Sequence, residues 1–402
     1  MMHRRSFLFS SLASGLLLPK SGRAATGERK FLFLFCPGGW DQCAFAAPLF
    51  DSYYVNMNTL GERSTIGGIT FVDHPQHPSL SAFLQKYASK TVLINGIESR
   101  SVAHDVCIRL MYTSSSDTQH DDWATLIAAH AQQNFLMPNV VFSGPSFGYQ
   151  YSDKVLRVGK QNQFIDLLSS TTDMDLELLE DFYVQQHLEQ QNSQMAQIAL
   201  EKEFALNNID IETFLNGDIN SASDGNSFSN QLHQVAQLFA QDQSKVVSMA
   251  YNGVGNLGWD THAGIHMQNW HLDELFSCLD SFMDTLSMTT ARSGEKLIDE
   301  VTIVVFSEMG RFPRLNFRDG RDHWTFTSLF MMGAGIEGGQ TIGGYDEYCL
   351  GQPTNLQSGL VANDGTLLTP KEIGATLLTL ADIDPLQYLQ ANPIQAILKG
   401  FS

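Results

Sequence analysis

One aspartate and two histidines stand close together in the segment Gly258–His266, which reads Gly-Trp-Asp-Thr-His-Ala-Gly-Ile-His. His266 follows His262 by four residues, so both imidazoles would lie on one face of a helix. Divalent metals bind this mixture of carboxylate oxygen and imidazole nitrogen. We therefore expect at least two of Asp260, His262 and His266 to bind a metal. A polar loop with an aspartate helix cap and surface histidines is the alternative.

Two further acids follow predicted strands. Asp41 comes after the apolar run 31–36 and a Pro-Gly-Gly turn. Glu308 follows the β-branched run 301–306, and His323 lies in the next loop. Open parallel sheets bind ligands beyond the carboxyl ends of their strands, so all three are candidate metal ligands. The alternatives are a turn or cap residue for Asp41, a helix N-terminal acid for Glu308, and an imidazole hydrogen-bonded to the preceding aspartate for His323.

The start of a predicted helix supplies candidates for the chemical step. The apolar run 91–96 reads as a strand, and a helix is expected after it, extending through Met111. Free amides at such a helix start attract anions and can lower the pKa of a nucleophile. Ser101 is therefore a candidate nucleophile, with a plain helix cap as the alternative. His104 is a candidate ligand or acid–base group, and Arg100 could pair with an anionic substrate.

The elements that must position these side chains alternate between strands and helices. Continuous apolar runs are the usual form of strands in parallel sheets. Besides those named above, strands are expected at 69–72, 138–142, 245–251 and 328–332, and helices at 79–87, 119–132, 268–288 and 369–381. Residues 160–243 are rich in Gln, Leu, Glu and Ala at helical spacing and predict a mostly helical insertion. The glycine run 333–339 lacks the GxGxxG spacing and predicts turns.

Charge and cysteine usage narrow the class of protein. The formal net charge is −19, and a chain this acidic is not expected to follow a nucleic-acid backbone. An anionic substrate would bind only where a metal or arginine reverses the local field. The five cysteines are scattered and form no CxxC pair, so a disulfide framework is not expected.

The N-terminus reads as an export signal. Residues 1–25 begin with Arg4-Arg5-Ser6-Phe7-Leu8, a twin-arginine signature, and continue through an apolar stretch to small residues. The apolar run 7–18 is too short for an ordinary membrane-spanning helix. We expect export by the twin-arginine machinery to a periplasmic or extracytoplasmic location. Membrane contact is expected only if the leader stays uncleaved.

The leader and four internal segments occur in an order that resembles a known family. The segments are Pro37–Asp41, Trp259–His262, Val305–Arg311 and Gly320–His323. Together they resemble the large bacterial family of twin-arginine-exported proteins of unknown function within the alkaline phosphatase and sulfatase superfamily. The resemblance spans roughly residues 1–110 and 240–345.

The resemblance implies a fold and a ligand set. Residues 26–402 would form an α/β domain, a three-layer α/β/α sandwich with a mostly parallel central sheet and metals at its carboxyl edge. Active members of the superfamily hydrolyse phosphate or sulfate esters with one or two metals and a Ser, Thr or modified Cys nucleophile. The positions that correspond to ligands are Asp41 and Glu308 for one site, and Asp260, His323 and one of His262 or His266 for the other.

The sequence departs from the superfamily pattern at two points, and two functional hypotheses therefore stay open. Ser307-Glu308 stands where the superfamily usually has Asp-His, and no Cys-x-Pro-x-Arg is present. The first hypothesis is an exported hydrolase of small anionic sulfate or phosphate esters that uses Zn²⁺, Ca²⁺, Mg²⁺ or Mn²⁺. Ser101 or water would attack, and His104 or His266 would act as acid or base. The second is a non-catalytic exported protein that keeps the fold and binds a partner or glycan.

Overall fold

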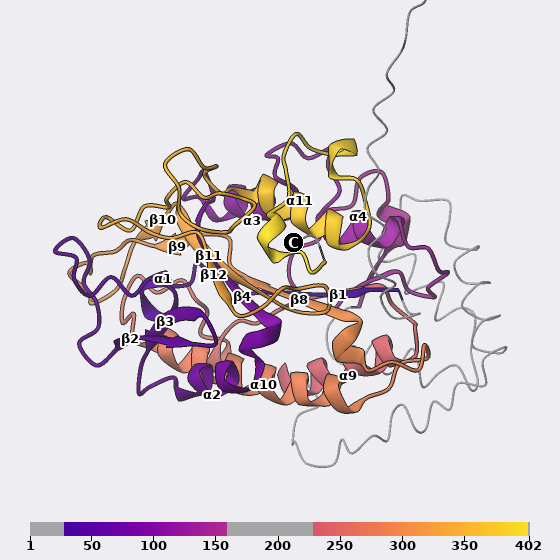
Figure 1. The fold of residues 1–402 in the computed structure, drawn as a ribbon, viewed down its shortest axis with the longest axis horizontal. Coiled ribbons are helices and arrows are strands. Elements are labelled where there is room, and N and C mark those ends of the chain that lie inside the picture. Colours follow the sequence, from indigo (N-terminus) through magenta and orange to yellow (C-terminus); the bar gives the residue numbers. More distant parts are fainter. Residues whose placement is uncertain (1–27, 159–227, 401–402) are drawn as a thin grey trace, which may run out of the picture.

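The computed structural model describes residues 28–158 and 228–400, which build a three-layer α/β/α sandwich around one large sheet (Figure 1). Eight strands in these residues form the sheet, in the order β12-β4-β11-β8-β1-β7-β5-β6. The strands are β1 Lys30–Phe35, β4 Thr91–Glu98, β5 Asn139–Val141, β6 Val155–Arg157, β7 Val246–Ala250, β8 Val301–Phe306, β11 Phe326–Gly333 and β12 Gln340–Ile342. The pairings are parallel except those of β11, which runs antiparallel to both β4 and β8. The predicted α/β class and mostly parallel sheet are confirmed.

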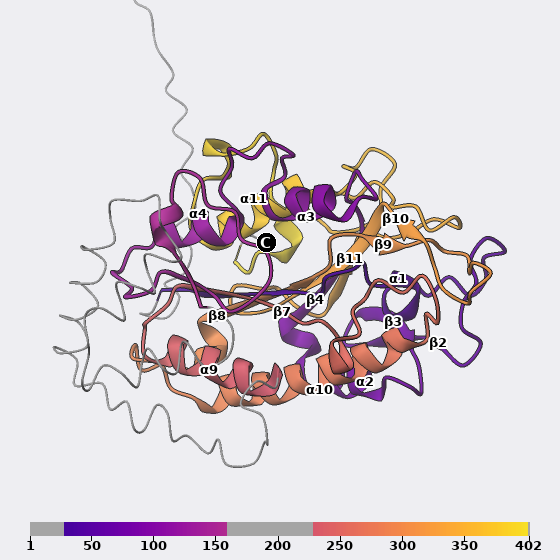
Figure 2. The same cartoon turned by 180° about the vertical axis from the view of Figure 1, so that it is seen from behind.

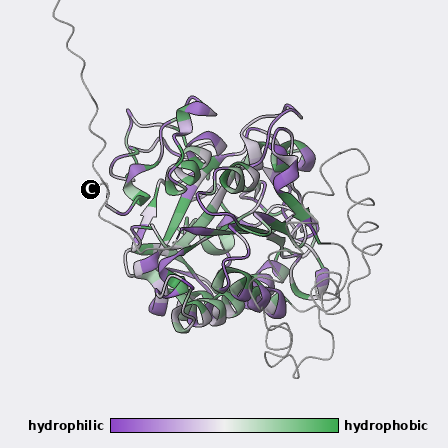
Figure 3. Ribbon diagram, turned by 90° about the vertical axis from the view of Figure 1, so that its right-hand side faces the viewer, coloured by the Kyte–Doolittle hydropathy of each residue, from purple (hydrophilic) through white to green (hydrophobic). Residues whose placement is uncertain are grey.

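The central strand β1 shows why the sheet is covered on both faces. All six of its residues are buried. Leu32 and Leu34 join the core on one face, while Phe31, Phe33 and Phe35 join the core on the other, as the two-residue period of a strand requires. Figure 3 shows apolar strands between the two helical layers. A strand buried on both faces needs the continuous apolar run that the sequence contains.

Helices of the described residues cover both faces of the sheet, as Figures 1 and 2 show from opposite sides. One layer holds α3 His104–Thr113, α4 Trp123–Ala129 and α11 Pro370–Leu380. The other holds α2 Pro78–Tyr87, α9 Phe228–Ala240 and α10 Met267–Met288. The sequence predicts all but α9 as separate helices. The expected helix 119–132 is shorter in the structure, because Asp122 caps α4 by accepting a hydrogen bond from the Thr125 amide at 2.7 Å.

Smaller elements lie outside the main sheet. The predicted strand 69–72 does form, as β3 Ile69–Asp73, but it pairs only with β2 Glu62–Ile66 in a separate hairpin. A second two-stranded ladder joins β9 Gly310–Arg311 to β10 His323–Trp324. The remaining short elements are α1 Gln42–Phe45 and 3-10 turns at Ala88–Lys90, Ser152–Lys154, Val254–Asn256, Leu297–Asp299, Pro385–Gln387 and Gln395–Ile397.

Two expectations fall largely outside the described residues. The predicted leader 1–25 lies there entirely, and the helical insertion expected at 160–243 is described only from residue 228, where α9 begins. Within residues 28–158 and 228–400, none of the helices combines the length and apolar character needed to cross a bilayer.

Candidate metal centre

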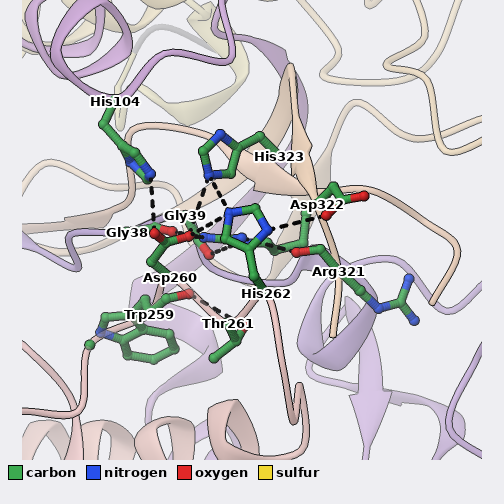
Figure 4. A network of polar contacts seen from close by, with 12 residues as sticks. Gly38, Gly39, His104, Trp259, Asp260, Thr261, His262, Arg321, Asp322 and His323 are labelled. Atoms are coloured by element: carbon green, nitrogen blue, oxygen red, sulfur yellow. Dashed lines mark hydrogen bonds and ion pairs between the residues drawn. The ribbon is translucent and has the colours of Figure 1, made fainter. Parts of the chain in front are cut away.

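Three histidines and one aspartate meet beyond the carboxyl edge of the sheet (Figure 4). His104 follows β4, Asp260 and His262 follow β7, and His323 precedes the antiparallel strand β11, so all three segments arrive at the same edge. One ligand atom each from His104, Asp260 and His323 lies within 4.8 Å of the others. Nε2 of His262 lies 3.0 Å from Nε2 of His323.

The Nδ1 atom of each imidazole faces an oxygen acceptor. The three contacts are Glu308 Oε1 at 2.7 Å for His104, Asp322 Oδ1 at 3.2 Å for His262, and the Val102 carbonyl at 2.7 Å for His323. In the neutral imidazole, Nδ1–H donates to these oxygens, and Nε2 is left with a lone pair. Metal-binding histidines are oriented in this way by an outer carboxylate or carbonyl.

The three Nε2 atoms point toward the Asp260 carboxylate. They lie 3.6 Å from Oδ2 for His104, and 3.2 Å and 3.3 Å from Oδ1 for His262 and His323. Nε2 of His104 is buried and has no hydrogen-bond partner among the described residues. With Nδ1–H on the outer acceptors, the Nε2 lone pairs and the Asp260 carboxylate would repel one another, and a cation between them would remove that repulsion. The donor set therefore fits a divalent metal of the kind that imidazole and carboxylate ligands hold.

A buried arginine stabilises the charge of Asp260. Arg311 is fully buried, and its Nη2 lies 2.5 Å from Asp260 Oδ1. Its remaining N–H groups donate to the carbonyls of Gly38, Gly39 and Arg321. Burial acts to raise the pKa of Asp260, but the Arg311 hydrogen bond and charge outweigh it, so the pKa is lowered. Asp260 is therefore ionised at neutral pH and can accept a cation.

Glu308 lies behind His104. Its buried carboxylate accepts hydrogen bonds from the amides of Gly38 at 2.8 Å and Gly39 at 3.2 Å, from Ser307 Oγ at 2.9 Å, and from His104. The hydrogen bond to Glu308 raises the pKa of His104 against the opposing effect of burial. The structure thus gives the predicted ligand Glu308 a different contact: it orients His104.

The two glycines beside Glu308 require their residue type. Gly38 has φ +119°, and a Cβ there would stand 2.6 Å from the Asp260 amide nitrogen. Gly39 has φ +80°, and a Cβ there would meet the Met309 side chain at 2.9 Å. Only glycine combines the positive φ with this close approach. The Gly-Gly turn therefore lets the loop after β1 donate two amides to Glu308 while contacting the loop that carries Asp260.

Asp41 makes its contacts away from this cluster. Its Oδ2 lies 3.0 Å from Arg321 Nε, and both side chains are 4% exposed. Its Oδ1 accepts from the Cys43 amide at 2.9 Å, so Asp41 caps the short helix α1, as the alternative interpretation predicts. Burial raises the pKa of Asp41, and Arg321 opposes the shift. The structure does not pair Asp41 with Glu308 in a ligand set.

His266 and Ser101 also lie outside the cluster. His266 is exposed, immediately precedes α10, and packs edge-on against Trp270. Residues 261–266 form bends and turns, so the expected shared helical face of His262 and His266 does not form. Ser101 Oγ accepts from the Ala103 amide at 3.1 Å and is not the residue that caps α3. No contact joins either side chain to the cluster within the described part of the chain.

The role of Arg311 is not among the functions expected from the sequence. Nothing in a single arginine after a predicted strand marks it as a partner of Asp260. The clustering of arginines is a sequence signal for this role. Residues 311–321 contain four of them: Arg311, Arg314, Arg318 and Arg321. Arg311 and Arg321 are buried beside the aspartates they pair with, whereas Arg314 and Arg318 are exposed.

Comparison with known proteins gives a family match and distant structural similarities. Residues 151–388 match the family described as "Protein of unknown function (DUF1501)". No curated protein matches the chain.

Solved structures similar to this chain share about a tenth of its sequence. The lipoteichoic acid synthase LtaP from Listeria monocytogenes is 10% identical, with a TM-score of 0.42 over 94% of this chain and 78% of that chain. A protein of the alkaline phosphatase superfamily from Vibrio parahaemolyticus is 11% identical, with a TM-score of 0.38 over 92% and 72%. A TAB5 alkaline phosphatase mutant with Mg bound is 12% identical, with a TM-score of 0.38 over 90% and 100%. Similarities this distant transfer neither an activity nor a ligand set.

Proposed function

The chain belongs to the DUF1501 family, and from the geometry of its site we propose that it is an exported, metal-dependent hydrolase of phosphate or sulfate esters. The observation that carries the proposal is the convergence of three Nε2 atoms on the Asp260 carboxylate. The other nitrogen of each ring faces an oxygen acceptor, which leaves Nε2 of each ring on the side of Asp260.

His104, Asp260 and His323 hold the metal in this proposal, and His262 completes the set. Imidazole-rich sets favour Zn²⁺ over Ca²⁺ or Mg²⁺, which prefer oxygen ligands. When bound, the divalent cation supplies Lewis-acid polarisation of the ester oxygen atoms. The Asp260 carboxylate and three imidazoles are 22–48% exposed, so a small ester can reach them from solvent.

The arginines around the site support an anionic substrate. The chain carries a formal charge of −19, which repels phosphate and sulfate esters at long range. Arg311 places a buried guanidinium beside Asp260, and Arg314 and Arg318 expose two more on the loop between β9 and β10. Arg314 and Arg318 thus put exposed positive charge on the loop that leads to His323, which can pair with an anionic ester.

Water is the nucleophile in this proposal. Ser101 Oγ accepts a hydrogen bond from its own turn and makes no contact with the cluster among the described residues. His104 keeps its Nδ1–H on Glu308 and presents Nε2 to the site, which fixes its tautomer during substrate binding. His266 lies outside the cluster, so no acid–base role is assigned to it.

Metal content and ester hydrolysis test the proposal together. We expect the purified full-length protein to bind one zinc and to hydrolyse at least one of a panel of aryl phosphates, phosphodiesters and aryl sulfates. His323→Ala removes one ligand and is expected to lower zinc affinity and activity by more than the roughly 10- to 100-fold that is typical when a residue that only orients a ligand is lost. His266→Ala, an exposed histidine outside the cluster, is the matched control and keeps both.

Two results would contradict the hydrolase. The metal site is excluded if the wild-type protein contains no zinc. It is also excluded if His323→Ala leaves zinc affinity and activity unchanged. A zinc-loaded protein inactive on the whole panel supports instead the second hypothesis, a non-catalytic exported protein that binds a partner or glycan.

A further inference from the structure

Two buried cysteines far apart in sequence lie in contact. The Sγ atoms of Cys43 and Cys349 are 4.0 Å apart, although 306 positions separate the residues. Cys43 belongs to α1, and Cys349 lies in the loop that follows β12. They are 4% and 0% exposed. Their distance in the sequence gives no reason to pair them.

The surroundings hold the two sulfurs in place. Cys43 and Cys349 form a small apolar cluster with Ala47 and Val55, separate from the two main cores. Gln42 Nε2 donates to Cys349 Sγ at 3.4 Å while also donating to the Arg311 carbonyl at 2.7 Å. The arrangement therefore depends on the same strand, β9, that carries Arg311.

The backbone of Cys349 is fixed as well. Its φ is +61°, and its amide donates to the Asp346 carbonyl at 3.0 Å. Its carbonyl accepts from Trp324 Nε1 at 2.9 Å, and Trp324 is the neighbour of the site residue His323. The loop that carries Cys349 is thus hydrogen-bonded to β10, the short strand that carries the site residue His323.

We propose that Cys43 and Cys349 are a disulfide site. A disulfide needs its sulfur atoms about 2.05 Å apart, so the pair must approach by about 2 Å. Side-chain rotation can supply much of this movement, since each Sγ turns about its own χ1. The loop of Cys349 also reaches the surface, where Tyr348 is 43% and Leu350 is 36% exposed. Opening of this loop would give an oxidant access to the thiols.

The bond forms by thiol–disulfide exchange with a small-molecule disulfide such as oxidised glutathione. One cysteine thiolate attacks a glutathione sulfur, giving a mixed disulfide and releasing one reduced glutathione. The second thiolate attacks the protein sulfur of that mixed disulfide, forms the Cys43–Cys349 bond and releases the second glutathione. Two electrons pass to the oxidant, and the two thiol protons end on the released glutathiones.

Peptide mapping tests the proposal without reference to activity, so it stands or falls separately from the hydrolase. The hydrogen bond with Cys349 and burial raise the pKa of Cys43 well above its ordinary value, so the exchange is run at alkaline pH. Full-length protein is incubated with oxidised or with reduced glutathione, unfolded, alkylated without reductant and digested. We expect a linked Cys43–Cys349 peptide after oxidation only. Both thiols alkylated after oxidation, or a bridge to another cysteine, would overturn the proposal.

Thermal unfolding gives an independent readout. A bond closing a loop this long constrains the unfolded chain, so oxidation is expected to raise the unfolding midpoint by several degrees. Cys349→Ser should abolish the oxidation-dependent rise. Cys278→Ser, which removes a thiol outside the pair, is the matched control and should keep it. Equal rises in both variants would show that the stabilisation comes from elsewhere.

Discussion

At the scale of single residues, the site depends on which atom of each side chain is already engaged. The three imidazoles use Nδ1 on Glu308, Asp322 and the Val102 carbonyl, and this leaves Nε2 for a ligand. The sequence predicts which residue types meet, but not these tautomers, because each is set by an acceptor distant in the chain. Glu308 and Asp41 show the same limit: both are acids after strands, yet one orients a histidine and the other pairs with an arginine.

Substituting Glu308 tests its role as the residue that orients His104. Glu308→Gln keeps the size and one acceptor oxygen but loses the charge that holds the Nδ1 proton of His104. We expect zinc affinity to fall by about 10- to 100-fold, as for other outer partners of metal ligands. Competition with a chromophoric chelator measures it. An unchanged affinity would mean that Glu308 does not position His104.

The Asp41–Arg321 pair is expected to support stability, not metal binding. Asp41→Ala leaves the buried Arg321 without its carboxylate, and such losses cost about 3–5 kcal/mol of unfolding free energy. The exposed pair of Asp51 and Arg63 is the control, because Asp51→Ala should cost at most about 1 kcal/mol. Urea unfolding measures both. If Asp41→Ala instead abolished zinc binding with stability unchanged, Asp41 would be a ligand after all.

At the scale of elements, the sheet could be predicted well and the loops could not. Runs such as those of β1 and β8 are buried on both faces and are therefore apolar apart from Lys30 and Thr302. The strands β6 and β12 have three residues each, too few to show a period. The loop before α10 was expected to place His262 and His266 on one helical face, but the helix begins only at Met267.

His271 links α10 to the loop that carries Asp260. Val254 N–H donates to its Nδ1 at 3.0 Å, and its Nε2–H donates to the Gly258 carbonyl at 3.0 Å, so the folded protein needs the neutral ring. Burial lowers the pKa of His271. The unfolded chain takes up the proton at its ordinary pKa of about 6.5, so stability is complete above that pH and is lost as the pH falls below it.

Removing this group should flatten the pH dependence. We expect His271→Asn to be less stable than the wild type at pH 7, because both hydrogen bonds cannot be kept. Its unfolding free energy should also fall less between about pH 7 and 5, since one proton-linked group is gone. Urea unfolding at several pH values measures the slope. A variant slope equal to that of the wild type would show that His271 does not contribute.

At the scale of the whole molecule, the fold explains why distant motifs meet. In a sheet whose strands are parallel except for β11, the carboxyl ends share one edge, so residues after β4, β7 and β8 converge. The sequence therefore predicts the position of the site better than its contacts. Export and location are also properties of the whole molecule. Their prediction rests on the N-terminal motif of the leader, Arg4-Arg5-Ser6-Phe7-Leu8.

The twin-arginine motif can be tested directly. Arg4→Lys with Arg5→Lys keeps the positive charge of the leader but removes the two arginines that the export machinery reads. We expect the wild type in the periplasmic fraction with its leader removed, and the double variant in the cytoplasm with its leader intact. Fractionation and mass spectrometry of the N-terminus measure both. Equal export of the two proteins would contradict the assignment.

The position of a bound zinc is the sharpest test of whether His104, Asp260 and His323 form a metal site. Anomalous X-ray diffraction from crystals of the zinc-loaded protein locates the metal without reference to any substrate. We expect one zinc peak with Nε2 of His104 and His323 and an oxygen of Asp260 at about 2.0–2.2 Å. A zinc held elsewhere, or bound through Nδ1 of these histidines, would contradict it.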